Sequence, residues 1–254
     1  MKHKRDQFLT VYGRKPVLEI LEKESLNIAK VFIARKAKAD IIRNILKACE
    51  RRGIEVLRVE AEQVSKISKH PKQDQGVAAD IHTPQMDDAM RFLEQHQGES
   101  LQLIALDGIT TPANVGMIIR SCTALGVDGI ILPRKGSSKL NSFVIKASAG
   151  VVFRSTILKC ERLTPVLKKA KELGYSIYGL SGEKGVNIYQ EAFDASSIFV
   201  MGNETMGVSP QTEALTDKHL FIPMANGVES LNVACAATVV ASELMRQKST
   251  RNFK

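Results

Sequence analysis

Three clusters of small polar residues and glycines have the composition of a ligand site, and each directly follows a short apolar run. One spans residues 222–233, Ile-Pro-Met-Ala-Asn-Gly-Val-Glu-Ser-Leu-Asn-Val, and leads into a helix rich in alanine. Its Ser230 and Asn232 stand at a strand-to-helix junction, where backbone N–H groups are free to bind a ligand. This composition favours a small-molecule site, although the alanines that follow also suit a tightly packed helix start.

A second cluster, residues 106–120, places an amide and a guanidinium on one predicted helix. Asn114 lies in its first turn, at the positive end of the helix dipole, where anions are stabilised. Arg120 follows Gly116 by four residues and therefore shares its face. The apolar neighbours of Arg120 predict that it is partly buried, and Gly116 beside it would leave room for a substrate phosphate or sugar. The alternative is a surface arginine on an amphipathic helix.

The third cluster, residues 199–208, is an apolar strand that ends in Gly-Asn-Glu. Gly202 would let a ligand approach the backbone closely, and Glu204 is the best-placed carboxylate in the chain. The alternative is an ordinary turn after a strand.

Several other catalytic signatures are absent from the sequence. It has no Walker A motif, no Gly-x-Ser-x-Gly elbow and no pair of histidines at metal-ligand spacing, and Gly-Leu-Ser-Gly-Glu-Lys-Gly at 179–185 is a weak match to a dinucleotide-binding loop. We therefore expect no metal site and assign no catalytic role to the five histidines.

A regular alternation of short apolar runs and helical patterns must position the three clusters. Strands are expected at 101–106, 129–132, 156–158, 176–180, 198–201 and 219–222, and helices at 113–125, 142–147, 163–173, 210–215 and 232–247. Such strands are typical of a parallel sheet with helices on both faces, in which ligands bind beyond the carboxyl ends of the strands. The pattern along residues 101–254 therefore predicts an α/β domain.

Residues 1–82 predict a second, smaller α/β domain. Its helices are expected at 14–23, 39–52 and 61–68, and its strands at 28–34, 54–59 and 76–81. Thr-Pro-Gln at 83–85 and Gly-Glu-Ser at 98–100 interrupt the pattern, so we place a linker at 83–100, with a surface helix possible at 86–97.

The composition narrows the class of protein. With 44% hydrophobic residues the chain is globular, and it has no apolar run long enough for a membrane span or a secretory signal. Its four cysteines lack Cys-x-x-Cys spacing and are expected to be reduced thiols of a cytoplasmic protein. Residues 1–82 hold 18 Lys and Arg against 11 Asp and Glu, and the remainder holds 18 against 16. This basic N-terminal third suits either a polyanion or a merely soluble surface.

Together the three clusters resemble the SpoU (TrmH) family within the SPOUT superfamily of RNA 2′-O-ribose methyltransferases. The family's motifs combine an Asn and an Arg at the separation of Asn114 and Arg120, Gly-Asn-Glu-x-x-Gly as at 202–207, and Ile-Pro-Met followed by Ser-Leu-Asn-Val. Lys-Ala-Ser-Ala-Gly at 146–150 is similar to another family segment, whereas Thr-Pro stands at 111–112 where Asp-Pro is frequent. Residues 14–81 resemble the substrate-binding module, related to small ribosomal proteins, that many members carry.

The resemblance implies properties that the residues alone do not predict. It implies a parallel sheet with a C-terminal trefoil knot, S-adenosylmethionine bent within that knot, and a homodimer whose active sites involve both subunits. By position, it assigns cofactor binding to Gly202, Ile222, Met224 and Leu231. It assigns catalysis to Asn114, Arg120, Glu204, Ser230 and Asn232. Arg120 would bind a substrate phosphate and steady the developing alkoxide, while the other four residues would orient the reacting groups.

The implied substrate is RNA, and the attached N-terminal domain favours a guanosine of 23S ribosomal RNA by analogy. The basic residues expected to grip it are Arg14, Lys15, Arg35, Lys36, Lys38, Arg51 and Arg52, each of which would singly also suit a solvated surface. Alternatives are a tRNA 2′-O-methyltransferase, a resistance-type rRNA methyltransferase and a non-catalytic RNA-binding protein of ribosome assembly. Pure RNA binding would not need the polar residues of the three clusters.

Overall fold

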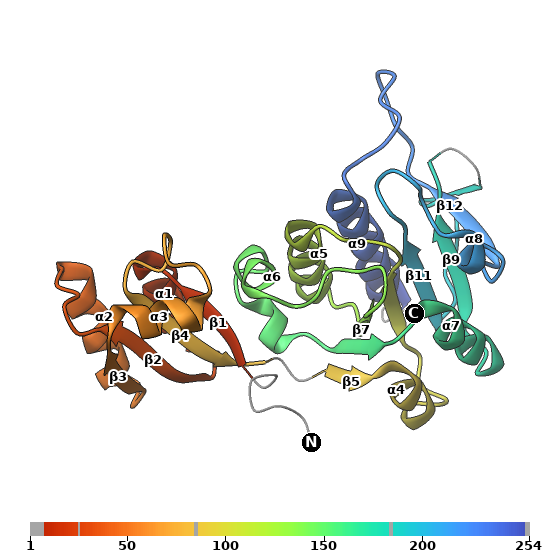
Figure 1. The fold of residues 1–254 in the computed structure, drawn as a ribbon. Helices are drawn as coiled ribbons and strands as arrows, with labels where there is room; N and C mark the ends of the chain where they lie inside the picture. The colour runs from red at the N-terminus through yellow and green to blue at the C-terminus, as the bar shows by residue number, and fades with distance from the viewer. Residues whose placement is uncertain (1–7, 25, 84–85, 183–184, 252–254) are drawn as a thin grey trace. The chain divides into compact units, whose positions relative to one another are not determined.

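The computed structural model describes residues 8–24, 26–83, 86–182 and 185–251 (Figure 1). The chain divides into two compact units, Met1–Pro84 and Gln85–Lys254. Each unit has its own sheet and its own buried core. No helix among the described residues is both long and apolar enough to cross a membrane.

The first unit is a four-stranded sheet in the order β1-β4-β2-β3. Its elements are β1 (Phe8–Tyr12), α1 (Arg14–Leu21), β2 (Ile28–Ala34), α2 (Asp40–Arg51), β3 (Glu55–Val59), α3 (Ala61–Ser68) and β4 (Val77–His82). β4 runs antiparallel to both β1 and β2, whereas β2 and β3 are parallel. Helix α3 covers the sheet face that carries Phe32 and Ala34 through its buried Val64. The helices α1 and α2, which pack on each other, cover the opposite face, which carries Val31 and Ile33.

The second unit is an eight-stranded sheet in the order β10-β12-β9-β11-β6-β7-β8-β5, and every pairing in it is parallel. The strands are β5 (Met86–Asp88), β6 (Gln102–Leu106), β7 (Gly129–Pro133), β8 (Ile157–Cys160), β9 (Ser176–Leu180), β10 (Val186–Asn187), β11 (Ser197–Met201) and β12 (Lys218–Phe221). β6, β7 and β11 are buried along their whole length, as expected of strands covered on both faces.

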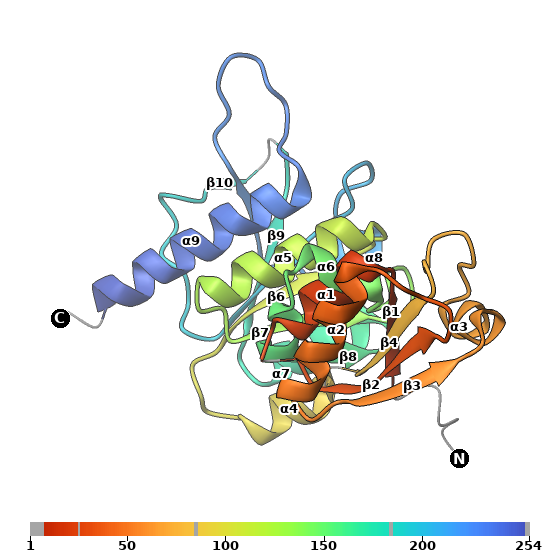
Figure 2. The ribbon, with the colours of Figure 1, turned by 90° about the vertical axis from the view of Figure 1, so that its left-hand side faces the viewer.

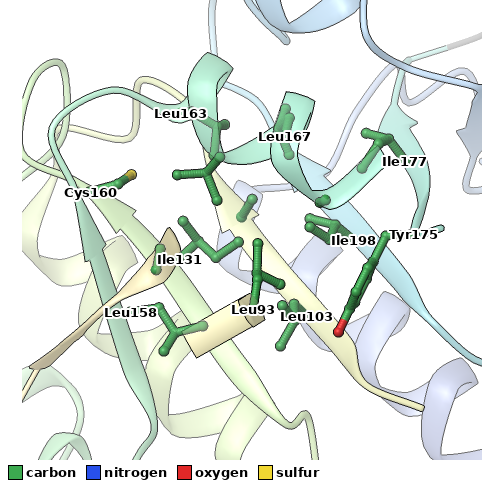
Figure 3. Close-up of a cluster of buried hydrophobic side chains, with 14 of the residues drawn as sticks. Leu93, Leu103, Ile131, Leu158, Cys160, Leu163, Leu167, Tyr175, Ile177 and Ile198 are labelled. Atoms are coloured by element: carbon green, nitrogen blue, oxygen red, sulfur yellow. The ribbon is translucent and has the colours of Figure 1, made fainter. Parts of the chain in front are cut away.

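Helices cover both faces of this sheet (Figures 1 and 2). α5 (Pro112–Ala124) packs on α6 (Ser142–Ala147) and on α9 (Val233–Arg251) on one face, with the 3₁₀ turn η2 (Val151–Arg154) beside it. α4 (Ala89–Gln95), α7 (Leu163–Glu172) and α8 (Pro210–Glu213) form the other layer. Under α4 and α7 lies a core cluster in which Leu93, Leu103, Ile131, Leu158 and Ile198 meet (Figure 3).

The segment 83–100 differs from the predicted linker. Met86–Asp88 is strand β5, which pairs with β8, and Ala89–Gln95 is helix α4, capped by Asp88. Ala89 and Leu93 are fully buried in the core of the second unit. A helix is therefore present within the predicted range 86–97, but its position at the surface and the unpacked linker are wrong for residues 86–95, because this segment packs into the second unit. Residues 83–85 connect β4 to β5 in the sequence. Pro84 and Gln85 lie outside the described residues.

The α/β architecture and the parallel sheet are confirmed. The trefoil knot stays a prediction. β1, β10 and η2 are elements that the sequence pattern did not predict, and α9 extends beyond its predicted end at 247.

Candidate active site

The three clusters meet at one edge of the second sheet. β12, β9, β11 and β6 are neighbours and run parallel, so the segments that leave their carboxyl ends come out side by side. These segments include 107–111 after β6, 202–209 after β11 and 222–232 after β12. The last projects beyond the body of the unit in both ribbon views (Figures 1 and 2). Its tip is a tight turn at Asn226 and Gly227, both at positive φ, closed by a Val228 N–H bond to the Ala225 carbonyl (3.2 Å).

A chain of side-chain hydrogen bonds joins the three segments. The Asn114 amide nitrogen, in the first turn of α5, donates to the Glu204 carboxylate. The Asn114 oxygen accepts from the Asn232 amide nitrogen (3.2 Å), and the Asn232 oxygen accepts from the Ala234 N–H (2.9 Å) at the start of α9. Asn114 is buried, whereas Glu204 and Asn232 are exposed. A single buried amide therefore fixes a carboxylate and a second amide at the surface.

The loop after β11 is held by Asn203. Its side-chain nitrogen donates to the Gly108 carbonyl (2.9 Å), and its oxygen accepts from the Thr205 and Met206 N–H groups (2.9 and 3.1 Å). A Cβ on Gly202 would lie 2.3 Å from the Gly207 carbonyl carbon. Gly202 is thus required by its own loop, which folds back onto it, and this backbone contact is sufficient to account for the glycine.

A cleft of about 300 Å³ opens beside this loop. Six of the predicted site residues line it, namely Gly202, Glu204, Ile222, Met224, Ser230 and Leu231. Its wall also contains Leu180 at the end of β9, Ser181 and Gly182 directly after it, and Glu229, none of which was among the predicted site residues. The glycine-rich run at 179–185 was the available signal for the β9 end. Asn232 and Asn114 are not part of the wall but are tied to it through Glu204.

The charge of the cleft wall is negative. Glu204 and Glu229 line it, and none of the described lining residues is Lys, Arg or His. Leu180, Ile222 and Leu231 give it apolar surface. Such a wall is suited to a ligand that combines an apolar ring with a positive charge, because a carboxylate and a nearby cation stabilise each other's charged forms.

The exposure of Arg120 on α5 differs from the prediction made from its apolar sequence neighbours. It is exposed rather than partly buried, and it shares an outward stripe with Ala113 and Met117, at i, i+4 and i+7. It does not line the cleft of its own chain. The apolar neighbours Ile118 and Ile119 point into the core, which leaves Arg120 on the opposite side of the helix.

Gly116 also has a different role from the predicted one. A Cβ there would lie 2.5 Å from the Ala147 Cβ, 2.8 Å from the Val144 carbonyl oxygen and 2.9 Å from the Ser148 nitrogen. The glycine therefore lets α5 and α6 approach closely, and no space remains for a substrate group. The expectation of an open patch at this position is wrong.

The predicted RNA-binding arginines and lysines have different surroundings. The Arg52 guanidinium donates to the carbonyls of Ile20, Leu21, Lys23 and Leu26 (2.6 to 3.4 Å), at and beyond the end of α1. Arg52 is thereby bonded within its own unit, and its contact with RNA stays a prediction. The Arg14 Nε donates to the Gln75 carbonyl (3.1 Å), and Arg35 forms an exposed ion pair with Glu60. The remaining four, Lys15, Lys36, Lys38 and Arg51, are exposed.

The thiols take no part in this site. Burial raises the pKa of Cys122 and Cys160 to about 12 and that of Cys49 to about 11, so these three are protonated at neutral pH. Cys235, on the outer side of α9, is exposed. Within the part of the chain that the structure describes, no group of three or more His, Cys, Asp or Glu side chains is arranged to hold a metal ion.

Comparison with known proteins gives the family. The SpoU rRNA Methylase family matches residues 101–242, and the family described as RNA 2′-O ribose methyltransferase substrate binding matches residues 10–87. The chain is 30% identical over 241 residues to the 23S rRNA (guanosine-2′-O-)-methyltransferase RlmB of Xanthomonas campestris pv. campestris, which covers 94% of this chain and 96% of that protein. It is also 30% identical over 253 residues to a protein of Mycolicibacterium gilvum described as an uncharacterized tRNA/rRNA methyltransferase, with 97% and 79% covered.

The fold agrees with this relationship. The crystal structure of the SpoU methyltransferase AviRb from Streptomyces viridochromogenes, in complex with AdoMet, superposes with a TM-score of 0.71 at 22% identity, covering 97% of this chain and 92% of that one. Sequence motifs, fold and the convergence of the three clusters thus agree, and the chain belongs to the SpoU rRNA methylase family.

Proposed function

We propose that this protein transfers a methyl group from S-adenosylmethionine to a ribose 2′-hydroxyl of RNA. The observation that carries the proposal is the hydrogen-bonded chain Glu204–Asn114–Asn232 at the edge of the cleft. It ties together the three segments that the family motifs occupy. A protein that only bound RNA would have no need to order a carboxylate and an amide beside a small-molecule cleft.

The residues of the cleft fit this cofactor. A volume of about 300 Å³ is at the lower end of the range for small-molecule sites. Leu180, Ile222 and Leu231 offer apolar surface to an adenine ring, and Glu204 and Glu229 suit a ligand that carries positive charge. When bound, S-adenosylmethionine supplies an electrophilic methyl group on a positively charged sulfur.

The protein's own part is to position groups and to manage charge. Asn114 holds Glu204 and Asn232 in fixed orientations, and Asn232 also caps α9, so their geometry is set before substrate arrives. Ser230 presents an exposed hydroxyl at the cleft. Because guanidinium groups do not act as bases in proteins, the role of Arg120 is to bind a phosphate of the RNA and to steady the negative charge that develops on the ribose oxygen.

Because Arg120 is outside the cleft of its own chain, we infer that it serves the cleft of a second copy in a homodimer. The exposed stripe Ala113, Met117 and Arg120 supports this arrangement, since Met117 is 41% exposed beside the arginine. Met245, on the neighbouring helix α9, is 48% exposed. Apolar side chains of this size at an open surface are typical of an interface.

Two variants distinguish a shared site from one built by a single chain. Arg120→Ala removes the guanidinium, and Ser230→Arg fills the cleft and gives it a cation; each is expected to abolish methyl transfer alone. Arg120→Ala should keep its affinity for S-adenosylmethionine. A heterodimer of the two, purified through different tags, contains one intact shared site, so it should recover about half of the wild-type rate. No recovery would mean that Arg120 acts within its own chain.

The RNA target is proposed as a guanosine of 23S ribosomal RNA in the cytoplasm. The relative from Xanthomonas campestris carries that activity in its name, and its similarity extends over both units of this chain. Because the relative from Mycolicibacterium gilvum is described for tRNA or rRNA, a tRNA target is the second candidate. Mapping 2′-O-methyl groups in total RNA with and without the gene decides between them, and loss of no mark would refute the proposed function.

A further inference from the structure

The first turn of α1, the loop at 69–76 and the end of β2 meet where strands of the first sheet end. β1 leads through Gly13 into α1, and the loop at 69–76 leads into the antiparallel neighbour β4. The Gly13 N–H donates to the Val77 carbonyl (3.0 Å), and the Ala34 N–H donates to the Gly76 carbonyl (2.8 Å). The Arg14 N–H also reaches the Gln75 side-chain oxygen (3.2 Å). We call this region the β1–β4 edge, comprising residues 12–15 and 69–76.

A buried carboxylate fixes the 69–76 loop. Asp74 is 3% exposed, and its oxygens accept from the hydroxyls of Ser65 and Ser68 (2.9 and 3.0 Å) and from the Gly76 N–H (2.8 Å). The Ser68 hydroxyl in turn accepts from the His70 N–H (3.0 Å). Each member of this buried network has a partner, which specifies one conformation of the loop. The position of His70 is therefore set by α3 and Asp74 before any ligand binds.

The His70 ring lies on a rigid support. It stacks on the Tyr12 ring with centroids 4.7 Å apart and planes 21° from parallel. Tyr12 is itself half-buried and packs against the core cluster under α3. His70 is exposed, and one face of its ring rests on Tyr12. An aromatic ring held this way is a platform on which a flat group can stack at little cost in side-chain entropy.

The charges around this platform are positive. Lys15, Lys69 and Lys72 are exposed. Arg14 is anchored through Nε to the Gln75 carbonyl, a bond that does not use its two terminal guanidinium nitrogens. The carboxylate of the edge, Asp74, is buried and bonded to α3 and to its own loop. A flat ring among cations is the combination by which proteins bind unpaired nucleotides, through stacking on the base and contacts to phosphates.

We propose that the β1–β4 edge binds an unpaired nucleotide of the RNA substrate, with its base on the exposed His70 ring and its phosphates held by Arg14, Lys15 and Lys72. This inference rests on the proposed function and adds to it a single-stranded recognition element. The bases of double-stranded RNA are already stacked on one another and would not reach the ring. A protein partner is disfavoured because the edge offers one small ring among charges and no apolar patch.

The same unit contains a matched control. His82 is also exposed and also packs on an aromatic ring, that of Phe8, at a centroid distance of 5.0 Å. Phe8 and Tyr12 are the two ends of β1, so the His82 pair lies about 14 Å from the His70 pair along the strand. The planes of Phe8 and His82 are 54° apart, so this pair offers no stacked platform.

The experiment compares full-length variants on an rRNA transcript that the wild-type enzyme methylates. His70→Ala should raise the KM for RNA about tenfold, with kcat and S-adenosylmethionine affinity unchanged, because one base loses its stacking partner. His70→Phe should restore the KM, and His82→Ala should leave it unchanged. Lys72→Gln should reduce the slope of log Kd against log salt by about 1, whereas His70→Ala should not change this slope.

Competition identifies the element that is bound. A single-stranded oligonucleotide should compete with the transcript for the wild type and only weakly for His70→Ala, whereas its fully paired duplex should compete equally for both. If His70→Ala and His82→Ala have the same KM on a substrate that the wild type methylates, or if the duplex shows the same dependence on His70, the inference is wrong. If the wild type methylates no RNA at all, it is the proposed function that fails.

Discussion

Gly116→Ala adds one methyl group where α5 crosses α6. The new Cβ would lie 2.5 Å from the Ala147 Cβ, 2.8 Å from the Val144 carbonyl oxygen and 2.9 Å from the Ser148 nitrogen, against 3.4–4 Å for ordinary contact. Two of these three neighbours are backbone atoms, which no side-chain rotation moves away. The helices must therefore separate by a fraction of an ångström along their contact.

The size of the effect follows from two opposing terms. Overpacking of this kind costs about 1–3 kcal/mol, and backbone neighbours place Gly116→Ala at the upper end, about 3 kcal/mol. Alanine in place of glycine inside a helix recovers about 1 kcal/mol through its higher helix propensity. The net loss is about 2 kcal/mol, which lowers the midpoint of thermal unfolding by about 4–8 °C for a unit of this length.

Calorimetry of the intact chain measures this loss. The transition of the second unit is the one that moves upward when S-adenosylmethionine is added. Gly182→Ala is the matched control, since Gly182 has no positive φ and a methyl group added to it would meet no heavy atom within 4 Å; its midpoint should stay within about 1 °C of the wild type. If Gly116→Ala keeps its midpoint and weakens RNA binding instead, the glycine provides substrate space and the packing argument is refuted.

Three further predictions concern other contacts. Arg52→Ala should lower the free energy of unfolding of the first unit by about 2–3 kcal/mol, because four carbonyls lose a charged donor, and it should leave the slope of log Kd for RNA against log salt unchanged. Arg51→Ala should reduce this slope and leave the free energy of unfolding unchanged. Urea titration measures the free energies of unfolding, and binding isotherms measure the slopes. Asn114→Ala should lower the single-turnover rate of methyl transfer at least about tenfold with RNA affinity intact, because Glu204 and Asn232 lose their shared partner; an unchanged rate would remove the hydrogen-bonded chain from catalysis. A thiol reagent at pH 8 should label Cys235 alone, since burial raises the pKa of Cys49 to about 11 and of Cys122 and Cys160 to about 12. Because the unfolded chain would release these three protons near its ordinary thiol pKa while the folded protein keeps them, stability should fall as the pH rises from about 9 to 11.

The periodic elements could be predicted from the sequence because they depend on local pattern. β2, α3, α6 and β9 have the bounds that the alternation of apolar residues predicts, and glycines mark the ends of others. β1 escaped prediction because its stability comes from β4, some 70 residues away, rather than from its own composition. β10 has two residues and no pattern of its own.

The site was predictable in its residue types but not in its connections. The three clusters were found because strand ends in a parallel sheet share an edge. The contacts of Gly116 and Arg52 were misjudged because each depends on an element that is distant in sequence, α6 for Gly116 and α1 for Arg52. The exposure of Arg120 was misjudged because it depends on which side of α5 packs against the rest of the unit. A glycine that admits a substrate and a glycine that admits a neighbouring helix look the same in a sequence, and only tertiary packing distinguishes them.

The burial of Ala89 and Leu93 in the core that α4 shares with α7 bears on how the enzyme can be divided. A recombinant fragment that begins at residue 101, where the methylase family match starts, would lack α4 and would leave β8 as a bare outer strand. Such a fragment would uncover the part of this core that α4 covers, on β8 and α7, and would be prone to self-association. A fragment that begins at Met86 would keep β5 paired with β8, so the catalytic unit of this chain is longer than its motifs suggest.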